Sequence, residues 1–205
     1  MKAIACLGLG YAIGCISPAA WISKKKNVDL KQEGTKNLGA TNTALVLGKK
    51  AGYFVLFFDM LKSVFSYKIA KFLFPQLMVA GLIAGIGVIL GHCFPVTMGF
   101  QGGKGLAAFG GLVLAYKPWM FAAIVIPGVI LKVLFNTGVV VPALASVMFP
   151  ILVWCHSHDI TQLLAVMAAC ALLIFMHREN LKLAKKKMDV VNTNEFFSKV
   201  FGGKK

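Results

Sequence analysis

The chain has 205 residues, of which 58% are hydrophobic and only 14% are charged. Soluble domains carry about a quarter charged residues, so this composition excludes an ordinary soluble domain. The net charge of +15, from 22 Lys and Arg against 7 Asp and Glu, indicates basic loops beside a membrane and no nucleic-acid partner.

The first predicted element is an apolar segment from Ala3 to Ile22. The stretch Ala3–Ser23 holds 21 residues without a charge, which is long enough to cross a hydrocarbon core of about 30 Å. Three lysines at 24–26 follow it as a stop signal. We therefore interpret this segment as a membrane-spanning helix rather than a cleaved signal peptide.

Six more apolar segments follow, so the sequence predicts an all-α integral membrane protein with seven transmembrane helices. These six cover Ala51–Phe74, Leu77–Leu90, Leu106–Tyr116, Trp119–Leu131, Val139–Cys155 and Ile160–Met176. The fourth and fifth of the seven are shorter than the roughly 20 residues of a perpendicular span, so they are expected to be tilted or to line a cavity. We predict a single membrane domain over 1–189 and a basic cytoplasmic tail over 190–205.

The basic residues predict the orientation of these helices. With seven spans, the first, third and fifth connections and the C-terminal tail share one side, and these segments hold 17 of the 22 Lys and Arg residues. The positive-inside rule then places the C-terminus in the cytoplasm and the N-terminus outside.

The first polar loop, Lys24–Lys50, contains a glycine-rich stretch with several side-chain donors. Glycines let consecutive backbone N–H groups converge on one anion, and Thr and Asn add further donors. A solvated basic loop at the membrane surface is the alternative. The candidate phosphate-binding residues are Gly34, Thr35, Lys36, Asn37, Gly39, Thr41 and Asn42.

A second polar loop, Gly91–Gly105, combines a histidine with glycines around a lysine. Backbone donors and a point charge together form a second candidate phosphate-binding site. The alternatives are an interfacial Lys that reaches the headgroup layer and a structural His. The candidate residues are His92, Gly102, Gly103, Lys104 and Gly105.

The third polar segment begins directly after the last apolar run, with His177, Arg178 and Asn180. The first two could also cap the end of that helix. Within the second predicted helix, Asp59 and Lys62 are three positions apart and can neutralise each other, as a structural ion pair or as support for a site.

Two other sets of residues are not expected to carry chemistry. His156 and His158 lie in a connection predicted to face outward, and two histidines at i, i+2 rarely hold a metal without a third ligand. The five Cys residues form no C-x-x-C pair, and we interpret them as small hydrophobic residues. No metal site is therefore expected.

Taken in order, these motifs resemble the acyl-phosphate-dependent glycerol-3-phosphate acyltransferases of bacteria, the PlsY family. The resemblance rests on G-x-x-N-x-G-A-T-N from Gly34, G-H-x-F-P-V from Gly91, F-x-G-G-K-G from Phe100, H-R-x-N from His177, and D-x-x-K at Asp59. It covers about Gly8 to Asp189.

The resemblance implies seven spans and a reaction at the cytoplasmic face of the bacterial cytoplasmic (inner) membrane. A fatty acyl group would move from acyl phosphate to the sn-1 hydroxyl of glycerol 3-phosphate, giving lysophosphatidic acid and phosphate without coenzyme A, cofactor or metal. Membrane lipids would surround the chain, and its oligomeric state is left open.

On this interpretation, the first loop, with Thr35 and Asn37, holds one phosphate, and Lys104 with its glycines and Arg178 holds the other. His177 is the first candidate for base or acceptor-positioning group and His92 is the second, while a substrate phosphate could take the proton instead. Asn180 joins the catalytic set. The chain departs from the usual family pattern at Thr35, Lys36, Leu45, Ser63, Gln101, Leu183, Lys187 and Asp189.

Two other functions are compatible with parts of the sequence. Short helices broken by Gly and Pro and charges within the membrane are also typical of a transporter of small molecules or anions. The third hypothesis is an acyltransferase homologue that has a different phosphorylated acceptor or no activity.

Overall fold

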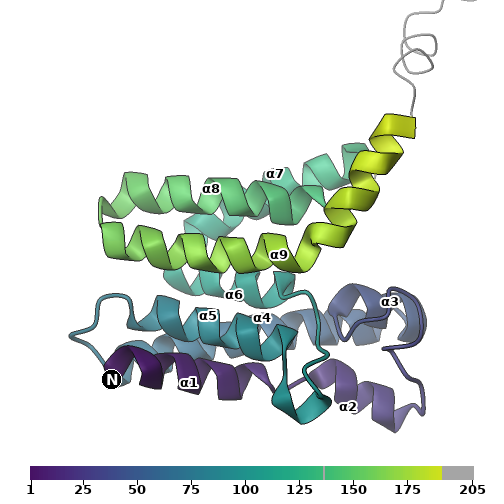
Figure 1. Cartoon of the computed structure of the whole chain (residues 1–205), viewed down its shortest axis with the longest axis horizontal. Helices are drawn as coiled ribbons and strands as arrows, with labels where there is room; N and C mark the ends of the chain where they lie inside the picture. The colour runs from purple at the N-terminus through teal and green to yellow at the C-terminus, as the bar shows by residue number, and fades with distance from the viewer. Residues whose placement is uncertain (136, 191–205) are drawn as a thin grey trace, which may run out of the picture.

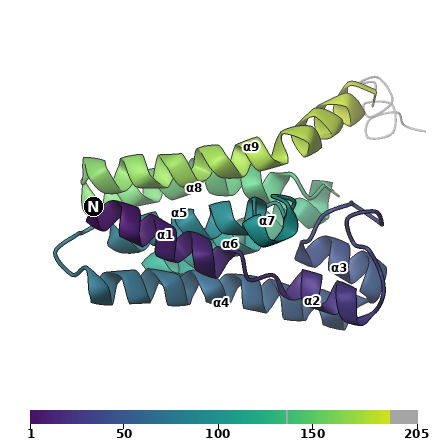
Figure 2. The ribbon, with the colours of Figure 1, turned by 60° about the horizontal axis from the view of Figure 1, so that its bottom comes forward.

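A computed structural model of the chain describes residues 1–135 and 137–190. Within these ranges the regular elements are α-helices and one short 3₁₀ turn, which confirms the all-α prediction. The helices lie side by side with their axes close to one common direction (Figure 1 and Figure 2). Their bounds are α1 Lys2–Gly14, α2 Pro18–Lys25, α3 Ala40–Leu47, α4 Lys49–Leu73, α5 Ala80–Cys93, η1 Val96–Met98, α6 Leu106–Tyr116, α7 Pro118–Phe135, α8 Val140–Ser157 and α9 Ile160–Val190.

Several helices are suited to a lipid bilayer. Five segments are long and apolar enough to cross a membrane: Lys2–Lys25, Ala80–Met98, Pro118–Phe135, Val140–Ser157 and Ile160–Ala184. Helix α4 has the length, with 25 residues, but it carries several charges, while α6 has only 11 residues. The multi-pass character of the chain is therefore clear, and the count of seven spans stays a prediction.

The first predicted helix is wrong as a single element, because it is broken into α1 and α2. Pro18 has no backbone N–H and disfavours helical geometry at the residue before it, so the helix cannot continue through this position. Ser17 then caps the new helix by accepting a hydrogen bond from the Ala20 N–H at 3.2 Å.

Two further predicted boundaries are corrected by the structure. Part of the first polar loop forms the short helix α3 between Gly39 and Gly48. Helix α9 does not end at Met176, because the polar residues after it are good helix formers without Gly or Pro, and it continues to Val190. Of the predicted tail over 190–205, residues 191–205 lie outside the described residues, as does position 136 of the predicted turn before α8.

Glycines bring α1 and α5 into close backbone contact. A Cβ at Gly10 or Gly14 of α1 would overlap the carbonyl oxygens of Ala84 or Val88 of α5. The same holds in reverse for Gly91, whose Cβ would overlap the Tyr11 carbonyl. Small residues at four-residue spacing commonly allow such contact between membrane helices.

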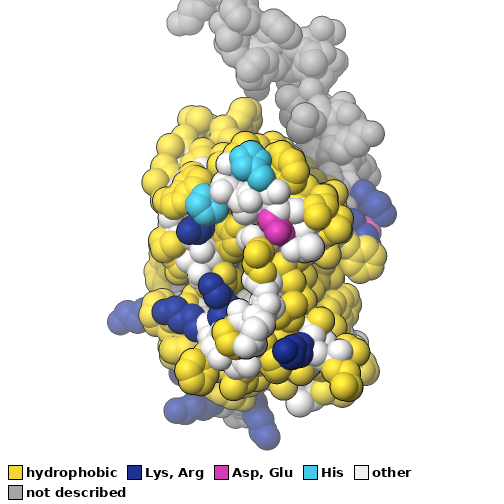
Figure 3. Space-filling model, turned by 90° about the vertical axis from the view of Figure 1, so that its left-hand side faces the viewer, with side chains coloured by type: hydrophobic (Ala, Val, Ile, Leu, Met, Phe, Trp, Pro, Cys, Tyr) yellow, Lys and Arg dark blue, Asp and Glu magenta, His cyan; other side chains and the backbone are white. Residues whose placement is uncertain are grey.

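The three polar segments meet at one end of the molecule. Helix α2, helix α3, the loop between α5 and α6, and the C-terminal part of α9 lie at the right-hand end in Figure 1. The N-terminus and the α4–α5 and α8–α9 connections lie at the opposite end, whose surface is largely hydrophobic with scattered basic side chains (Figure 3). This arrangement places the candidate site at a single end of the bundle.

Candidate active site

Asn42 organises the first polar loop from inside. Its side chain is fully buried. The carboxamide oxygen accepts the Thr35 N–H at 2.6 Å, and the amide nitrogen donates to the carbonyls of Leu30 and Asn37 at 2.8 and 2.9 Å. Because these contacts use both amide hydrogens and the oxygen, Asn42 shapes the loop rather than offering a free donor to a ligand.

The N-terminus of α3 is left open at this loop. The structure gives the N–H groups of Gly39, Ala40, Thr41 and Asn42 no hydrogen-bond partner within the described ranges. These groups carry the positive end of the helix dipole, so they favour an anion. Nearby, the exposed Thr35 hydroxyl accepts a 2.8 Å hydrogen bond from the Asn37 amide.

Two other predicted residues shape or border this loop. Gly34 has a φ of +59°, and a Cβ there would overlap the Asn42 carboxamide oxygen. Lys36 is exposed and has a φ of +54°. Both residues therefore belong to the tight turn that Asn42 closes, and Lys36 leaves a free cation at its surface.

The second glycine-rich loop folds back onto the end of α5. The N–H groups of Gly102 and Gly103 donate to the carbonyls of Cys93 and His92, each at 3.1 Å. The Leu38 N–H donates to the Gly102 carbonyl at 3.3 Å. The two polar loops that the sequence singled out are therefore in direct backbone contact.

The N-terminus of α6 is open in the same way. Gly105 precedes this helix with a φ of +81°, a left-handed conformation that favours glycine. Among the described residues, the backbone N–H groups of 104–108 have no hydrogen-bond partner. Five consecutive free donors at a helix start form a strong anion site.

Lys104 adds its charge to this site and connects it to α9. Its ammonium lies 2.7 Å from the Asn180 carboxamide oxygen. The side chain is half-buried, and this burial lowers the pKa of Lys104. Binding an anion beside the ammonium would offset this cost of burial.

His177 lies on the same face of α9 as Asn180, three positions earlier. It is buried, and its Nδ1 lies 2.9 Å from the Leu173 carbonyl. Because a carbonyl can only accept, Nδ1 carries the hydrogen and Nε2 of the neutral ring is an acceptor. The sequence placed His177 in a tail, whereas it sits within a helix.

Arg178 is not brought to Lys104. Its guanidinium lies 4.1 Å from the centre of the Phe175 ring and donates to the Phe175 carbonyl at 2.8 Å. The side chain is half-exposed, and its Nε lies 3.8 Å from Glu179. Its assistance to a phosphate therefore stays a prediction that requires the side chain to rotate.

His92 lies behind the glycine loop, with only 6% of the residue exposed. The predicted ion pair between Asp59 and Lys62 is confirmed at 2.7 Å, and both side chains are buried. Sequence reasoning missed that His92 joins this pair, with its Nδ1 3.3 Å from Asp59 and 3.0 Å from Lys62. No local pattern signals this contact, because it joins α4 to α5.

The geometry combines two adjacent anion sites with a neutral imidazole. The starts of α3 and α6 touch through Leu38 and Gly102, and Lys104, His177 and Asn180 lie beside the second of them. Such an arrangement can hold two phosphates near each other and can accept a proton at Nε2 of His177. The described residues contain no group of three His, Cys, Asp or Glu that could hold a metal ion.

Comparison with known proteins gives a consistent result. A model of the family described as "Glycerol-3-phosphate acyltransferase" matches residues 4–187. A glycerol-3-phosphate acyltransferase of Streptococcus sanguinis (strain SK36) is 32% identical over 200 residues, covering 92% of this chain and 91% of the relative. One of Desulfotalea psychrophila (strain LSv54 / DSM 12343) is 38% identical over 182 residues, covering 85% and 90%.

Two solved structures are also similar. Both are crystal structures of PlsY (YgiH), described as an integral membrane glycerol 3-phosphate acyltransferase. The glycerol 3-phosphate form has a TM-score of 0.84 and 29% identity, covering 91% of this chain and 94% of the other. The lysophosphatidic acid form has a TM-score of 0.82 and 28% identity, covering 91% and 93%.

Proposed function

This chain belongs to the glycerol-3-phosphate acyltransferase family, and from that premise we propose that it uses acyl phosphate as donor and the sn-1 hydroxyl of glycerol 3-phosphate as acceptor. The chain is an integral membrane acyltransferase that acts on glycerol 3-phosphate. In the proposed reaction the hydroxyl oxygen bonds to the acyl carbonyl carbon, and the bond from that carbon to the phosphate oxygen breaks. The hydroxyl proton leaves, and the products are lysophosphatidic acid and phosphate.

The observation that carries the choice of substrates is the contact between the two open helix starts. Both the donor and the acceptor carry a phosphate group, and each open start suits one of them. The Leu38–Gly102 hydrogen bond of 3.3 Å keeps the two starts adjacent. This proximity supports a reaction in which both phosphorylated molecules are bound at once and their reacting atoms are aligned.

We assign the first loop, with Thr35, Asn37 and the start of α3, to one phosphate. The start of α6, with Lys104 and Asn180, takes the other. Phosphate is a weak base as a leaving group, so the reaction needs positioning and charge neutralisation more than a strong acid.

The hydroxyl proton has a suitable acceptor on α9. Nε2 of His177 is free to accept a hydrogen bond, because Nδ1 is the donor to Leu173. We assign His177 to orient the hydroxyl and to receive its proton as the new ester bond forms. Asn180, one turn further along α9, would hold the substrate beside Lys104.

We further propose that the site faces the cytoplasm in the bacterial inner membrane, with the N-terminus outside. The support is the distribution of basic residues, because 17 of 22 belong to the segments assigned to the site-bearing side. Acyl chains would enter from the surrounding lipid, and glycerol 3-phosphate from the water.

An acyl-transfer assay on the purified protein tests this function. The donors are acyl phosphate, acyl coenzyme A and acyl carrier protein. The acceptors are labelled glycerol 3-phosphate, glycerol and other phosphorylated polyols. Lysophosphatidic acid formed only from acyl phosphate and glycerol 3-phosphate is the expected result. Faster transfer from acyl coenzyme A would contradict the donor, and a preference for another polyol phosphate would contradict the acceptor.

A further inference from the structure

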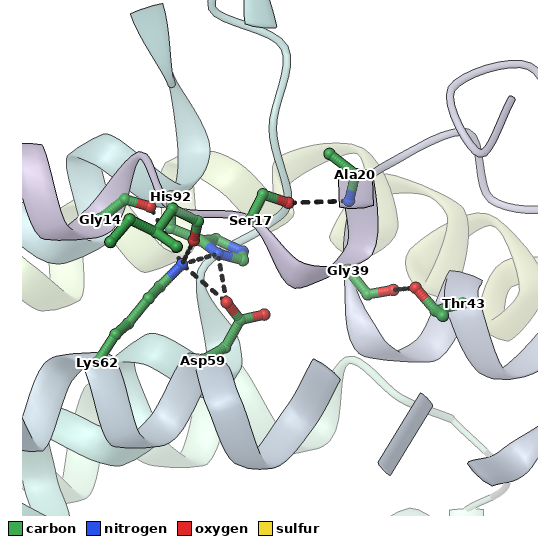
Figure 4. A network of polar contacts seen from close by, with 9 residues as sticks. Gly14, Ser17, Ala20, Gly39, Thr43, Asp59, Lys62 and His92 are labelled. Carbon is green, nitrogen blue, oxygen red and sulfur yellow. Dashed lines mark hydrogen bonds and ion pairs between the residues drawn. The ribbon is translucent and has the colours of Figure 1, made fainter. Parts of the chain in front are cut away.

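A buried cluster of charged and titratable side chains, shown in Figure 4, joins Asp59, Lys62 and His92. Its His92 ring lies next to Gly103 of the candidate active site. The Lys62 ammonium has four close polar neighbours. They are the Asp59 carboxylate at 2.7 Å, His92 Nδ1 at 3.0 Å, and the carbonyls of Gly14 and Ile16, each at 3.1 Å. The cluster joins the end of α1, the middle of α4 and the end of α5.

The break between α1 and α2 explains why a lysine is needed here. In a continuous helix the Gly14 carbonyl would accept from the N–H four residues later, which is Pro18 and has none. The Lys62 ammonium supplies the missing donor. A cation also suits the negative end of the α1 dipole.

The number of hydrogens determines which ring nitrogen of His92 is protonated. An ammonium can only donate, and the three hydrogens of Lys62 are directed to the Gly14 carbonyl, the Ile16 carbonyl and His92 Nδ1. Nδ1 is therefore the accepting nitrogen, and Nε2 of the neutral ring carries the hydrogen. Asp59 faces Lys62 as an ion pair at 2.7 Å, and its Oδ1 has no hydrogen-bond partner among the described residues. The other tautomer would set two donors against each other across 3.0 Å, and a charged ring would add a second cation there.

This tautomer presents the Nε2–H edge of the ring to the glycine loop. A Cβ at Gly103 would overlap Nε2, so the ring edge fills the space beside that glycine. The main chain of the same histidine holds the same glycine, because the Gly103 N–H donates to the His92 carbonyl at 3.1 Å. Gly103, immediately before Lys104, therefore contacts both the backbone and the side chain of His92.

We infer that Lys62, paired with Asp59, holds His92 as the Nε2–H tautomer, and that His92 is the positioning residue for the Gly102–Lys104 loop. Its ring fixes the loop so that the N–H groups at the start of α6 and the Lys104 ammonium meet one phosphate. The second half of this inference rests on the proposed function, whereas the tautomer does not.

The tautomer is tested by NMR on the unmodified sequence labelled with ¹⁵N-histidine in detergent micelles. Long-range ¹H–¹⁵N correlations distinguish Nδ1–H, Nε2–H and charged rings. Variants that replace His156, His158 and His177 by Gln, one at a time, identify the signal of His92 without altering it. A neutral ring with hydrogen on Nε2 is expected, and an Nδ1–H tautomer or an imidazolium at neutral pH would overturn the inference.

The positioning role is tested by kinetics with both substrates. His92→Asn keeps a side-chain oxygen that can accept from Lys62 but removes the ring edge beside Gly103. We expect it to raise the KM of one phosphorylated substrate about tenfold, and this should be the same substrate whose KM rises in Lys104→Ala. Ser66→Ala, which alters another buried polar residue of α4, is the matched control and should leave both KM values unchanged.

A merely structural role gives a different pattern. If His92 only supports the fold, the variant contains less active protein, so the apparent kcat falls while both KM values stay unchanged. That result would overturn the positioning role. A rise only in the KM of the other substrate would do the same. If the unmodified protein does not acylate glycerol 3-phosphate at all, the proposed function fails, and the NMR measurement still decides the state of His92.

Discussion

The Lys104 ammonium lies 2.7 Å from the Asn180 carboxamide oxygen, although the two residues are 76 positions apart in the chain. This contact joins the start of α6 to the extended part of α9. The partner of Lys104 is a neutral amide, and a phosphate would form a stronger, charge-assisted hydrogen bond with the ammonium. The site is therefore prepared for an anion.

Lys104→Ala should lower turnover at least tenfold. Charge-assisted hydrogen bonds contribute about 1.5–3 kcal/mol each, and 1.4 kcal/mol corresponds to about a factor of ten in rate. Lys104→Arg should also be impaired, because a planar guanidinium does not replace a point charge in this half-buried position. Steady-state kinetics with both substrates measures the effect.

Lys182→Ala is the control, since its side chain on α9 is 72% exposed and pairs with Glu179. Near-normal rates in Lys104→Ala together with strong loss in Lys182→Ala would contradict the assignment. The mild effect predicted for alanine at Lys185, Lys186 and Lys187, whose side chains lie outside the described residues, is tested in the same set.

Gly103→Ala should abolish most activity although every charge is kept. The added Cβ would overlap His92 Nε2 and lie 2.9 Å from the Leu38 carbonyl oxygen, so the two polar loops must separate. Gly110→Ala is the matched control, because a Cβ at that position of α6 meets only Phe121, at 3.4 Å. Equal kinetics for the two variants would show that the loop contact is dispensable.

Lys62→Met should destabilise the fold by roughly 3–5 kcal/mol, because it leaves the Asp59 charge buried without its partner. The double variant Asp59→Leu/Lys62→Met should cost less than the sum of its two single changes, since it removes both charges. Denaturant unfolding in detergent measures both effects. Lys68→Met, at an exposed position of the same helix, is the control. Simple additivity would show that the buried pair is not coupled.

The predicted orientation is testable with cysteine labelling in intact cells. Cys155 is the exposed native cysteine of the described residues, and it lies at the end of α8 opposite the site. An impermeant thiol reagent should label it from outside. A cysteine introduced at Lys182, in a Cys155→Ser background, should react only after the cells are opened. The reverse pattern would require the opposite orientation.

The double variant His156→Ala/His158→Ala should keep normal acyl transfer. Both residues lie at the α8–α9 connection, where their rings pack edge-on against Trp119 and Trp154. This connection is at the opposite end of the bundle from the loop between α5 and α6, which carries Lys104 (Figure 1). Loss of activity in a variant that still folds would show that the outward end takes part in the reaction.

Much of this molecule could be predicted from local patterns in the sequence. The apolar run Leu106–Tyr116 coincides with α6, and the other predicted segments match helices with shifted ends, except the first, which is broken into α1 and α2. The glycine-rich loops and Lys104 also stand out in the sequence, because glycine spacing and charge are properties of neighbouring residues. The roles of these residues, and those of His177 and Asn180, stay predictions. Hydropathy and helical period therefore determined the fold class and the chemistry of the loops.

The tertiary structure decided which of these residues meet. Asn42 lies in the same motif as Thr35 and Asn37, yet its buried side chain is taken up by the loop backbone, whereas Arg178 turns away from Lys104. The buried Lys62 is explained only when α4 lies against the carbonyl groups that Pro18 leaves free at the end of α1. Such contacts depend on how helices pack across dozens of positions, and no periodicity along the chain encodes which carbonyl a distant lysine will reach.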